Sequence, residues 1–288
     1  MLIVGCGDVG RKIAARVQLR GEPVRCLVRS VESAASLLEA GLDASAVDLD
    51  RQAPAPGDLP DQGQIFYLAP PPASGDRDPR MRRFLAALPP GKRQRIVYIS
   101  TTGVYGDCAG ELVDENRPAI PQTDRARRRH DAEQQLRAWR AAGGGEIVIL
   151  RVAGIYGPGK LPLERLKKRV PMIEECDAPW TNRIHIDDLA TVCEAAMAHG
   201  IDNEIYNVSD GHPGNMRDYF DRVADRYGLP RAPAISLREA RATLSPGMLS
   251  YLGESRRLDN RKMLGQLGVT LRYPDLASGL ASCHPDVP

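Results

Sequence analysis

Residues 2–10 read Leu-Ile-Val-Gly-Cys-Gly-Asp-Val-Gly, in which an apolar run leads directly into a Gly-x-Gly-x-x-Gly turn. In dinucleotide-binding proteins, the first glycine of this pattern permits a tight turn and the second lets the backbone approach a pyrophosphate. The third lets the following helix pack closely on the strand. These roles fall on Gly5, Gly7 and Gly10. The helix then points its N-terminal amides, which carry a partial positive charge, at the phosphates.

The sequence around this turn supports the interpretation. A helix beginning at about Asp8 has one apolar face, formed by Val9, Ile13, Ala14 and Val17. A second apolar run, residues 24–28, follows within about 20 residues, as a βαβ unit requires. We therefore predict a dinucleotide-binding βαβ unit at the start of the chain. The alternative is a glycine-rich turn in another kind of α/β protein.

Composition narrows the class of protein. The chain has 288 residues and a formal net charge of +2, so nothing indicates binding to nucleic acid or to a membrane surface. Six of its 39 basic residues are lysines and the rest are arginines. The six cysteines show no Cys-x-x-Cys spacing, which argues against a metal site and against a disulfide framework.

The sequence also indicates in which compartment the protein is located. No segment approaches the roughly 20 apolar residues needed to cross a bilayer. Met1 stands almost inside the first apolar run, so we expect no signal peptide and a cytoplasmic protein.

Apolar runs that suit strands recur along the chain, and helical patterns separate most of them. Such alternation predicts an α/β fold, a Rossmann-type doubly wound parallel sheet with a small C-terminal substrate lobe. We expect residues 1–157 to form the NAD(P)-binding domain, with 180–212 returning to it, and 158–179 and 213–288 to form the lobe. The expected strands are 2–4, 24–28, 46–49, 65–69, 96–100, 147–152 and 205–208.

The residues at the end of the second apolar run indicate which cofactor is preferred, NAD(H) or NADP(H). It reads Leu27-Val28-Arg29-Ser30, whereas an NAD-preferring site usually places an acid there to bind the ribose hydroxyls. Arginine can instead pair with a 2′-phosphate. Arg29 and Ser30 therefore favour NADP(H), while NAD(H) remains open if Arg29 is only a solvated strand end.

Four further motifs resemble one family. They are Tyr98-Ile-Ser-Thr-Thr-Gly-Val-Tyr-Gly106, Leu150-Arg-Val-Ala-Gly-Ile-Tyr-Gly-Pro158, Arg183-Ile-His-Ile-Asp-Asp-Leu-Ala190 and Tyr206-Asn-Val-Ser-Asp210. In order and approximate spacing they resemble the extended short-chain dehydrogenases/reductases, the NAD-dependent epimerase/dehydratase group. The resemblance covers nearly the whole chain. The spacing of the opening glycines resembles an atypical branch, because extended members usually have Gly-x-x-Gly-x-x-Gly.

The resemblance implies a Ser/Thr, Tyr, Lys active site. In such a site the tyrosine exchanges a proton with the substrate while a hydride moves to or from the nicotinamide. The Ser/Thr position falls on Thr101, with Thr102 as the next candidate; a strand-end threonine that bonds its own backbone is the structural alternative.

The Tyr-x-x-x-Lys motif is absent from its usual place in the chain. It belongs on a helix at roughly 122–142, where the family pattern places Arg125 in the tyrosine position and Arg129 in the lysine position. Arg129 could keep the positioning role of the lysine but cannot release a proton. His130 and Tyr105 are the other candidates for a proton donor, and a solvated basic helix face is the structural alternative for the arginines.

The resemblance also implies where the cofactor lies, including the chain that follows the fourth strand. The residues expected to contact it are Gly5, Gly7, Asp8, Val9, Gly10, Arg29, Ser30, Asp48, Leu68, Ala69 and Pro70. A catalytic role for His185 is discounted, because Asp188 has the position of a helix N-cap and His185 would order that loop.

We expect an NAD(P)-binding oxidoreductase or epimerase that acts by hydride transfer on a polar alcohol or carbonyl compound, such as a nucleotide-sugar-like metabolite. The alternative is a non-catalytic NADP(H)-binding redox sensor or regulatory protein, because the usual acid is missing. The expected partner is a small-molecule substrate, and a homodimer is left open.

Overall fold

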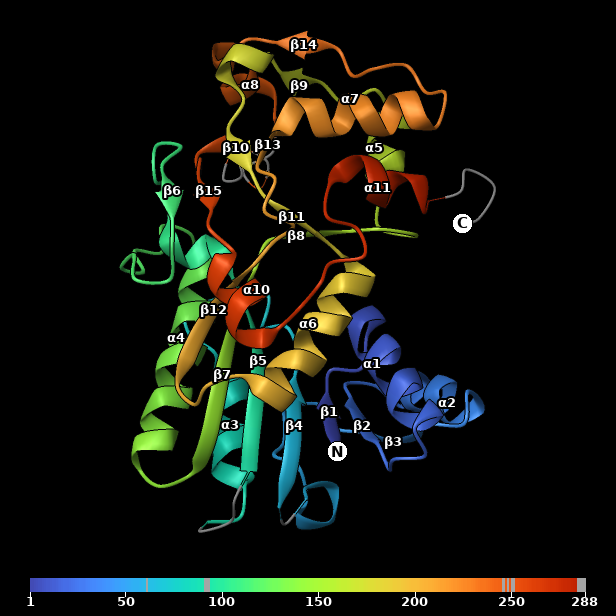
Figure 1. Ribbon diagram of the computed structural model, residues 1–288, viewed down its shortest axis with the longest axis vertical. Coiled ribbons are helices and arrows are strands. Elements are labelled where there is room, and N and C mark those ends of the chain that lie inside the picture. Colours follow the sequence, from blue (N-terminus) through green and yellow to red (C-terminus); the bar gives the residue numbers. More distant parts are fainter. Residues whose placement is uncertain (61, 91–93, 245–246, 248, 250–251, 284–288) are drawn as a thin grey trace.

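The structure is a computed structural model that describes residues 1–60, 62–90, 94–244, 247, 249 and 252–283. It contains one large sheet, covered on both faces by helices, and a smaller lobe above the carboxyl ends of the strands (Figure 1). The strands of the large sheet are β1 (Leu2–Val4), β2 (Arg25–Val28), β3 (Asp43–Ala46), β4 (Gly63–Tyr67), β5 (Gln94–Thr101), β7 (Gly145–Val152) and β12 (Glu204–Val208).

The remaining elements are helices and short strand pairs. The helices are α1 (Asp8–Leu19), α2 (Val31–Glu39), α3 (Pro79–Ala87), α4 (Asp124–Ala141), α5 (Leu163–Lys167), α6 (Ile186–His199), α7 (Met216–Arg226), α8 (Leu237–Thr243), α10 (Arg261–Leu267) and α11 (Leu276–Ala281). Single 3₁₀ turns lie at Pro56–Asp58, Thr102–Tyr105 and Glu175–Asp177. The strand pairs are β6 (Leu112–Val113) with β15 (Arg257–Leu258), β8 (Gly154–Tyr156) with β11 (Arg183–His185), β9 (Met172–Ile173) with β14 (Ala234–Ile235), and β10 (Trp180–Thr181) with β13 (Gly214–Asn215).

The sheet has the doubly wound topology that the alternating pattern predicts. Its strand order is β12-β7-β5-β4-β1-β2-β3, and all seven strands are parallel. The order reverses between β1 and β4, and in such sheets a ligand binds in the crevice at that reversal. The glycine turn follows β1 and therefore lies at this crevice.

The third predicted strand is displaced. We expected 46–49, but β3 is Asp43–Ala46, whose residues are mostly half-buried and small or polar. It is an edge strand with β2 as its partner, so it does not need the apolar run that a central strand needs. The apolar residues Val47 and Leu49 come after the strand and pack in the core.

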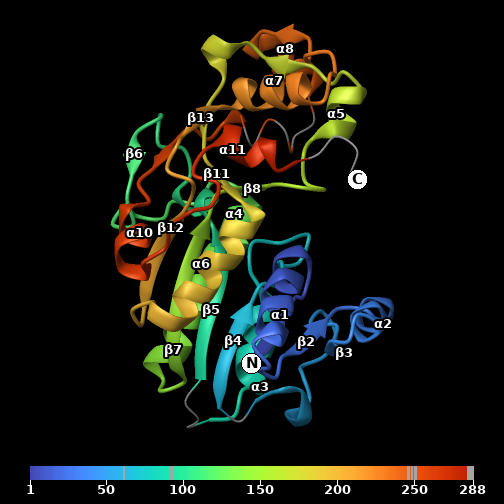
Figure 2. The same cartoon turned by 45° about the vertical axis from the view of Figure 1, so that its right-hand side comes forward.

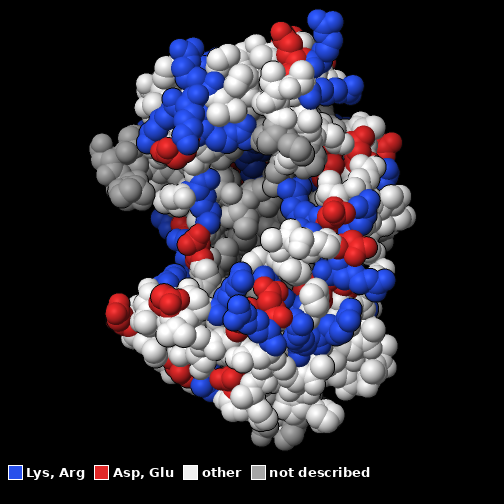
Figure 3. Space-filling model, turned by 180° about the vertical axis from the view of Figure 1, so that it is seen from behind, with Lys and Arg blue, Asp and Glu red and all other residues white. Residues whose placement is uncertain are grey.

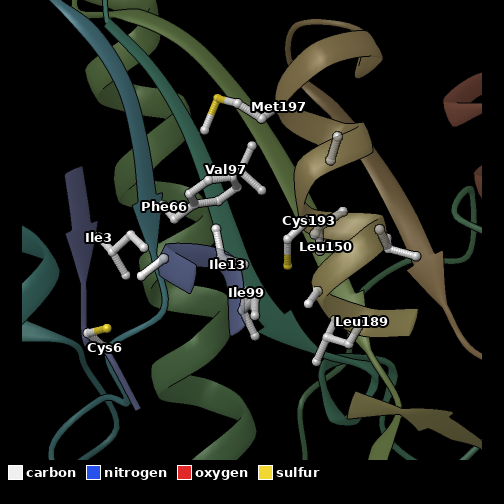
Figure 4. Packing of buried hydrophobic residues seen from close by; sticks show 14 of the residues in the cluster. Ile3, Cys6, Ile13, Phe66, Val97, Ile99, Leu150, Leu189, Cys193 and Met197 are labelled. Atoms are coloured by element: carbon white, nitrogen blue, oxygen red, sulfur yellow. The ribbon is translucent and has the colours of Figure 1, made fainter. Parts of the chain in front are cut away.

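Each face of the sheet has its own core. On one face α1, α2 and α6 pack on the strands, and Figure 4 shows Ile3, Ile13, Phe66 and Cys193 within this cluster. On the other face α3 and α4 pack on side chains such as Tyr67 and Tyr98. This arrangement explains why the central strands are nearly continuous in apolar residues.

The lobe consists mainly of α5, α7, α8, α11 and the β9–β14 pair, and Figure 2 shows these four helices gathered at one end of the molecule. It has a separate apolar cluster around Phe220 and Val223. One part of the expected lobe, α10, lies elsewhere. Met263 and Leu267 of α10 belong to the core that α1 and α6 share, so this segment returns to the large sheet. In the described residues, no helix is long and apolar enough to cross a membrane.

A buried ion pair links α4 to β7. Arg151 donates to Glu133 at 2.8 Å, and Ser100 donates to the same carboxylate at 2.5 Å. Both charged side chains are almost inaccessible to solvent. Burial alone would raise the pKa of Glu133, but His130 and Arg151 outweigh it and hold that pKa below its ordinary value of 4.5. The pair therefore fixes the direction in which α4 crosses the sheet.

We predict that Glu133→Gln lowers the free energy of unfolding by about 3–5 kcal/mol at neutral pH, because it leaves the Arg151 guanidinium buried without a counter-charge. The double variant Glu133→Gln/Arg151→Met should regain part of this loss, as measured by urea denaturation. The wild-type contribution is complete above pH 4.5 and is lost as the pH falls through the lower folded-state pKa. An acid limb that is unchanged in Glu133→Gln would contradict this assignment.

Candidate functional site

The glycine turn after β1 has the geometry that its spacing predicts. Gly5 has a φ of +88°, and a Cβ on it would lie 2.5 Å from the backbone of Ala69. A Cβ on Gly10 would lie 3.2 Å from Ile3, so α1 packs closely on β1. A Cβ on Gly7 would meet nothing within 4 Å. The turn is therefore fixed at Gly5 and Gly10 and open at Gly7.

The N-terminus of α1 faces this open space. Gly7 is the N-cap and no side chain accepts from the first amides of the helix. The carboxylate of Asp8 pairs instead with Lys160, from the loop that follows β8. Because the first N–H groups of a helix favour an anion, the turn suits the pyrophosphate of a dinucleotide.

A cavity of about 130 Å³ adjoins the turn. It brings together five of the residues expected to bind the cofactor: Gly5, Arg29, Asp48, Ala69 and Pro70. Its other walls are largely apolar and include Leu27, Val47 and Leu49. Apolar walls with a carboxylate at hand suit a flat ring that carries an amino group, as adenine does.

Ser30 has a structural role in this region. Its hydroxyl accepts from Ser33 N–H at 3.2 Å and so caps α2. Ser30 does not line the cavity in the described part of the chain. The Arg29 side chain, 68% exposed, lies 3.6 Å from both Asp48 and Asp50. Val9 and Leu68, also expected to contact the cofactor, are partly buried and pack against the core.

Arg80 is a residue of this cavity that the sequence reasoning missed. Its Nε donates to Asp50 at 2.7 Å, and one terminal nitrogen donates to the carbonyl of Pro70 at 2.8 Å. The same interaction holds the pKa of Asp50 below its ordinary value. Arg80 thus fixes the chain after β4 beside the glycine turn. The sequence signal was Asp78-Pro79, an N-cap followed by a proline, which places Arg80 in the first turn of α3.

A larger cleft, of about 710 Å³, lies between the sheet and the lobe. It brings together Thr101, Thr102, Arg125 and Arg129, which the family pattern selects from two distant segments. Its walls also include Pro70, which lines the smaller cavity as well. The two cavities therefore lie on either side of the same residue, where the chain leaves β4.

Thr101 and Arg129 each have a local partner. The Thr101 hydroxyl accepts from Gly103 N–H at 3.2 Å, which leaves its own hydrogen available for donation. One terminal nitrogen of Arg129 donates to the Ile99 carbonyl at 2.7 Å, and its guanidinium lies over the Tyr98 ring. Thr102 is buried beside them.

Tyr105 does not supply a hydroxyl to this cleft. It is 2% exposed, and its hydroxyl donates to Asn207 Oδ1 at 2.7 Å. Arg151 stacks on its ring at 4.6 Å. Because the turn at Thr102–Tyr105 directs this side chain into the interior, the prediction that it acts as a proton donor is corrected. His130 is likewise outside the described cleft lining.

His185 orders the segment before α6 as expected, whereas Asp188 is not the N-cap that the sequence predicts. His185 is the N-cap, and its Nδ1 accepts from Asp187 N–H at 3.2 Å. Asp188 is not the cap; its carboxylate accepts from the backbone N–H groups of Arg272 and Tyr273. Burial lowers the pKa of His185. A neutral His185 with this tautomer donates from Nε2 toward Ser282, so it is not a base.

These features define a Rossmann-type protein with a glycine turn of the dinucleotide-binding kind beside a large cleft. The chain belongs to the NAD-dependent epimerase/dehydratase family, whose model matches residues 81–209. Residues 122–142, where the sequence analysis expects the catalytic tyrosine and lysine of that family, contain neither residue type.

Three relatives are similar over most of their length. A functionally unknown conserved protein from Silicibacter pomeroyi DSS is 30% identical, with a TM-score of 0.81 over 99% of this chain and 98% of that one. Protein YeeZ of Escherichia coli (strain K12) is 24% identical over 95% of this chain and 96% of its own. The 4-hydroxy-2-methyl-3-oxo-4-farnesyl-3,4-dihydroquinoline-1-oxide ketoreductase of Stigmatella aurantiaca is 25% identical over 87% of this chain and 78% of its own.

The open space at Gly7 makes a sharp test of the cofactor site. Gly7→Val should abolish binding of NADPH and NADH in a fluorescence titration, because its side chain would fill the space left for the pyrophosphate. The melting temperature should stay within about 2 °C of wild type, since a Cβ here meets no protein atom. Retained binding with an intact fold would refute the site.

Proposed function

We propose that this protein is an NAD(P)-dependent oxidoreductase or epimerase that exchanges a hydride with a polar alcohol or carbonyl compound. The observation that carries the proposal is that Pro70 lines both cavities. The cavity beside the glycine turn and the cleft that contains Thr101 are therefore neighbours. The name of the Stigmatella aurantiaca relative, a ketoreductase, agrees with this class of reaction.

In this proposal, residues of the smaller cavity would bind the cofactor and residues of the larger cleft would bind the substrate. Gly7 and the first amides of α1 would hold the pyrophosphate, and Asp48 would accept a hydrogen bond from the adenine amino group. When bound, the nicotinamide supplies or accepts the hydride. The Thr101 hydroxyl would donate to the reacting oxygen of the substrate.

Arginines take the positions of the usual tyrosine and lysine. Arg125 and Arg129 line the cleft beside Thr101. A guanidinium stabilises a developing negative charge on oxygen but does not release its proton at any ordinary pH. The proton exchange must therefore pass to water in the cleft.

NADP(H) is the proposed cofactor, with Arg29 as its determinant. A 2′-phosphate would compete with Asp48 and Asp50 for the Arg29 guanidinium. Each carboxylate lies 3.6 Å from the guanidinium, so the Arg29 side chain remains available to the phosphate. The proposal extends to location and partners: a cytoplasmic protein whose partner is a small molecule rather than nucleic acid or membrane. A homodimer is compatible with it.

We predict that Arg29→Asp weakens NADPH at least about tenfold while NADH changes less than about threefold, because only NADPH loses an ion pair. Dissociation constants from fluorescence titrations give the ratio. The matched control is Arg51→Asp, since Arg51 also lies beside Asp48 but does not line the cavity in the described chain. An unchanged NADPH-to-NADH ratio would remove the NADP(H) assignment.

A second function, a non-catalytic redox sensor, is favoured by the titratable groups of the cleft. Among its described lining residues there is no lysine or histidine. The Tyr156 hydroxyl donates to the Asp275 carbonyl at 3.1 Å, and burial raises the pKa of Tyr219 to about 12. Neither is a ready acid at neutral pH.

One experiment separates the two functions. The purified protein is mixed with NADPH and a panel of aldehydes, ketones and oxo acids, and the loss of NADPH absorbance is followed; the reverse panel uses NADP⁺ and alcohols. Turnover of any member supports the enzyme, and it should fall in Thr101→Val. Micromolar binding of NADPH without turnover, together with a protein partner that binds one redox state only, would establish the sensor.

A further inference from the structure

The large cleft is strongly unbalanced in charge. Among its described lining residues, one is acidic, Glu254, and it is already paired with Arg256 at 2.8 Å. The basic lining residues are Arg125, Arg128, Arg129, Arg165, Arg183 and Arg256. Figure 3 shows basic side chains on both the lobe and the Rossmann domain around the hollow between them.

One group of arginines comes from the first two turns of α4. Arg125, Arg128 and Arg129 share a face of the helix because they are three and four residues apart. Arg128 donates to the Gly75 carbonyl and Arg129 to the Ile99 carbonyl, so both side chains are held in place. In the described chain no carboxylate pairs with either of them, whereas the outward-facing Arg127 pairs with Asp124 at 2.7 Å. Arg128 and Arg129 thus line the cleft without a described carboxylate partner.

A second group comes from the lobe side. The Arg183 guanidinium lies 3.8 Å from the centre of the Tyr219 ring and donates to Thr181 Oγ1 at 2.7 Å. Burial lowers the pKa of Arg183, and no described carboxylate forms an ion pair with it. Arg165 lies over the Phe220 ring at 5.3 Å, and burial lowers its pKa too. A buried cation such as Arg183 would be stabilised by an anion that enters the cleft.

The wall that connects the two groups is apolar. Residues 152–156 lead from the end of β7 into β8 and line the cleft with Val152, Ile155 and Tyr156. Met216 and Phe220 of α7 face the same space. A ligand that reaches both groups of arginines therefore places an apolar body against these side chains.

We propose that the cleft binds an amphipathic diacid, with one carboxylate or phosphate at the α4 arginines, another at Arg183 and Arg165, and an apolar body between them. The proposal rests on the proposed function and names its substrate class. The acidic group at the α4 end lies beside Thr101, so the reacting carbon belongs to an oxo or hydroxy acid. UDP-glucose is different, because its sugar, the reacting end, is neutral.

The test measures binding with defined probes. A series of straight-chain α,ω-diacids from butanedioate to decanedioate is titrated by calorimetry, with the monoacid and the diol of each length as matched probes. We expect one length of diacid to bind at least about tenfold more tightly than its monoacid, and its diol not to bind. Added salt should weaken the diacid more than the monoacid.

Variants test which arginines bind each of the two acidic groups of the diacid. Arg125→Met and Arg183→Met should each reduce the best diacid to the affinity of its monoacid. Arg183→Lys should retain part of the higher affinity for the diacid over its monoacid, because it keeps the positive charge. This variant therefore separates the effect of lost charge from the effect of disturbed structure. The matched control is Arg137→Met, an exposed arginine on the same helix outside the described cleft lining, and it should bind as wild type.

Several results would overturn the proposal. They are equal binding of diacid and monoacid, binding of the diol, no binding of any acid at about 10 mM, or a loss in Arg137→Met as large as in Arg125→Met. Tighter binding of UDP-glucose than of every diacid would return the substrate to the nucleotide sugars. The titrations are made with and without NADPH, so a failure of cofactor binding, which refutes the proposed function, is seen separately from a failure of diacid binding.

Discussion

The close approach of two chain segments, the turn at Gly5 and the chain leaving β4 at Ala69, is the constraint on which the rest of the site depends. No side chain larger than hydrogen fits at Gly5, because a Cβ would lie 2.5 Å from the Ala69 backbone. The φ of +88° adds a second reason for glycine. This contact brings β1 and β4, the strands on either side of the reversal in strand order, to one crevice. Gly7 and Pro70 are placed by it, and with them the two cavities.

Electrostatics then fix what the backbone places. Arg80 ties Asp50 to the carbonyl of Pro70, and Lys160 ties the loop after β8 to Asp8 at the start of α1. Glu133 and Arg151 hold α4 against β7. In a chain with six lysines among 39 basic residues, most of these links are made by arginine. Its planar fork can serve a carboxylate and a backbone carbonyl at once, as Arg80 does.

The sequence predicted the parts of this structure that depend on local patterns. Six of the seven predicted strands are confirmed in place, as is the helix at 122–142, because buried parallel strands need long apolar runs. The edge strand β3 was displaced since an edge does not need such a run. Tyr105 was misjudged because a one-turn helix directs its side chain inward, which spacing alone does not reveal. Arg80 and the six-arginine cleft were missed since they depend on contacts between segments far apart in the chain.

The arginines in the cleft change what the family's fold can do. In the family pattern one residue both polarises the reacting oxygen and exchanges its proton, and its neighbour tunes that residue. Here Arg125 and Arg129 line the cleft together with Thr101, and a guanidinium supplies positive charge without acting as a proton donor. In the proposed function, polarisation of the reacting oxygen would therefore be retained, while proton exchange would pass to water in the cleft. An acidic group on the proposed substrate, held by these same arginines, would place a negative charge among the basic side chains of the cleft, next to the reacting oxygen. It would not itself replace the tyrosine as proton donor, because an anion paired with guanidinium groups stays ionised.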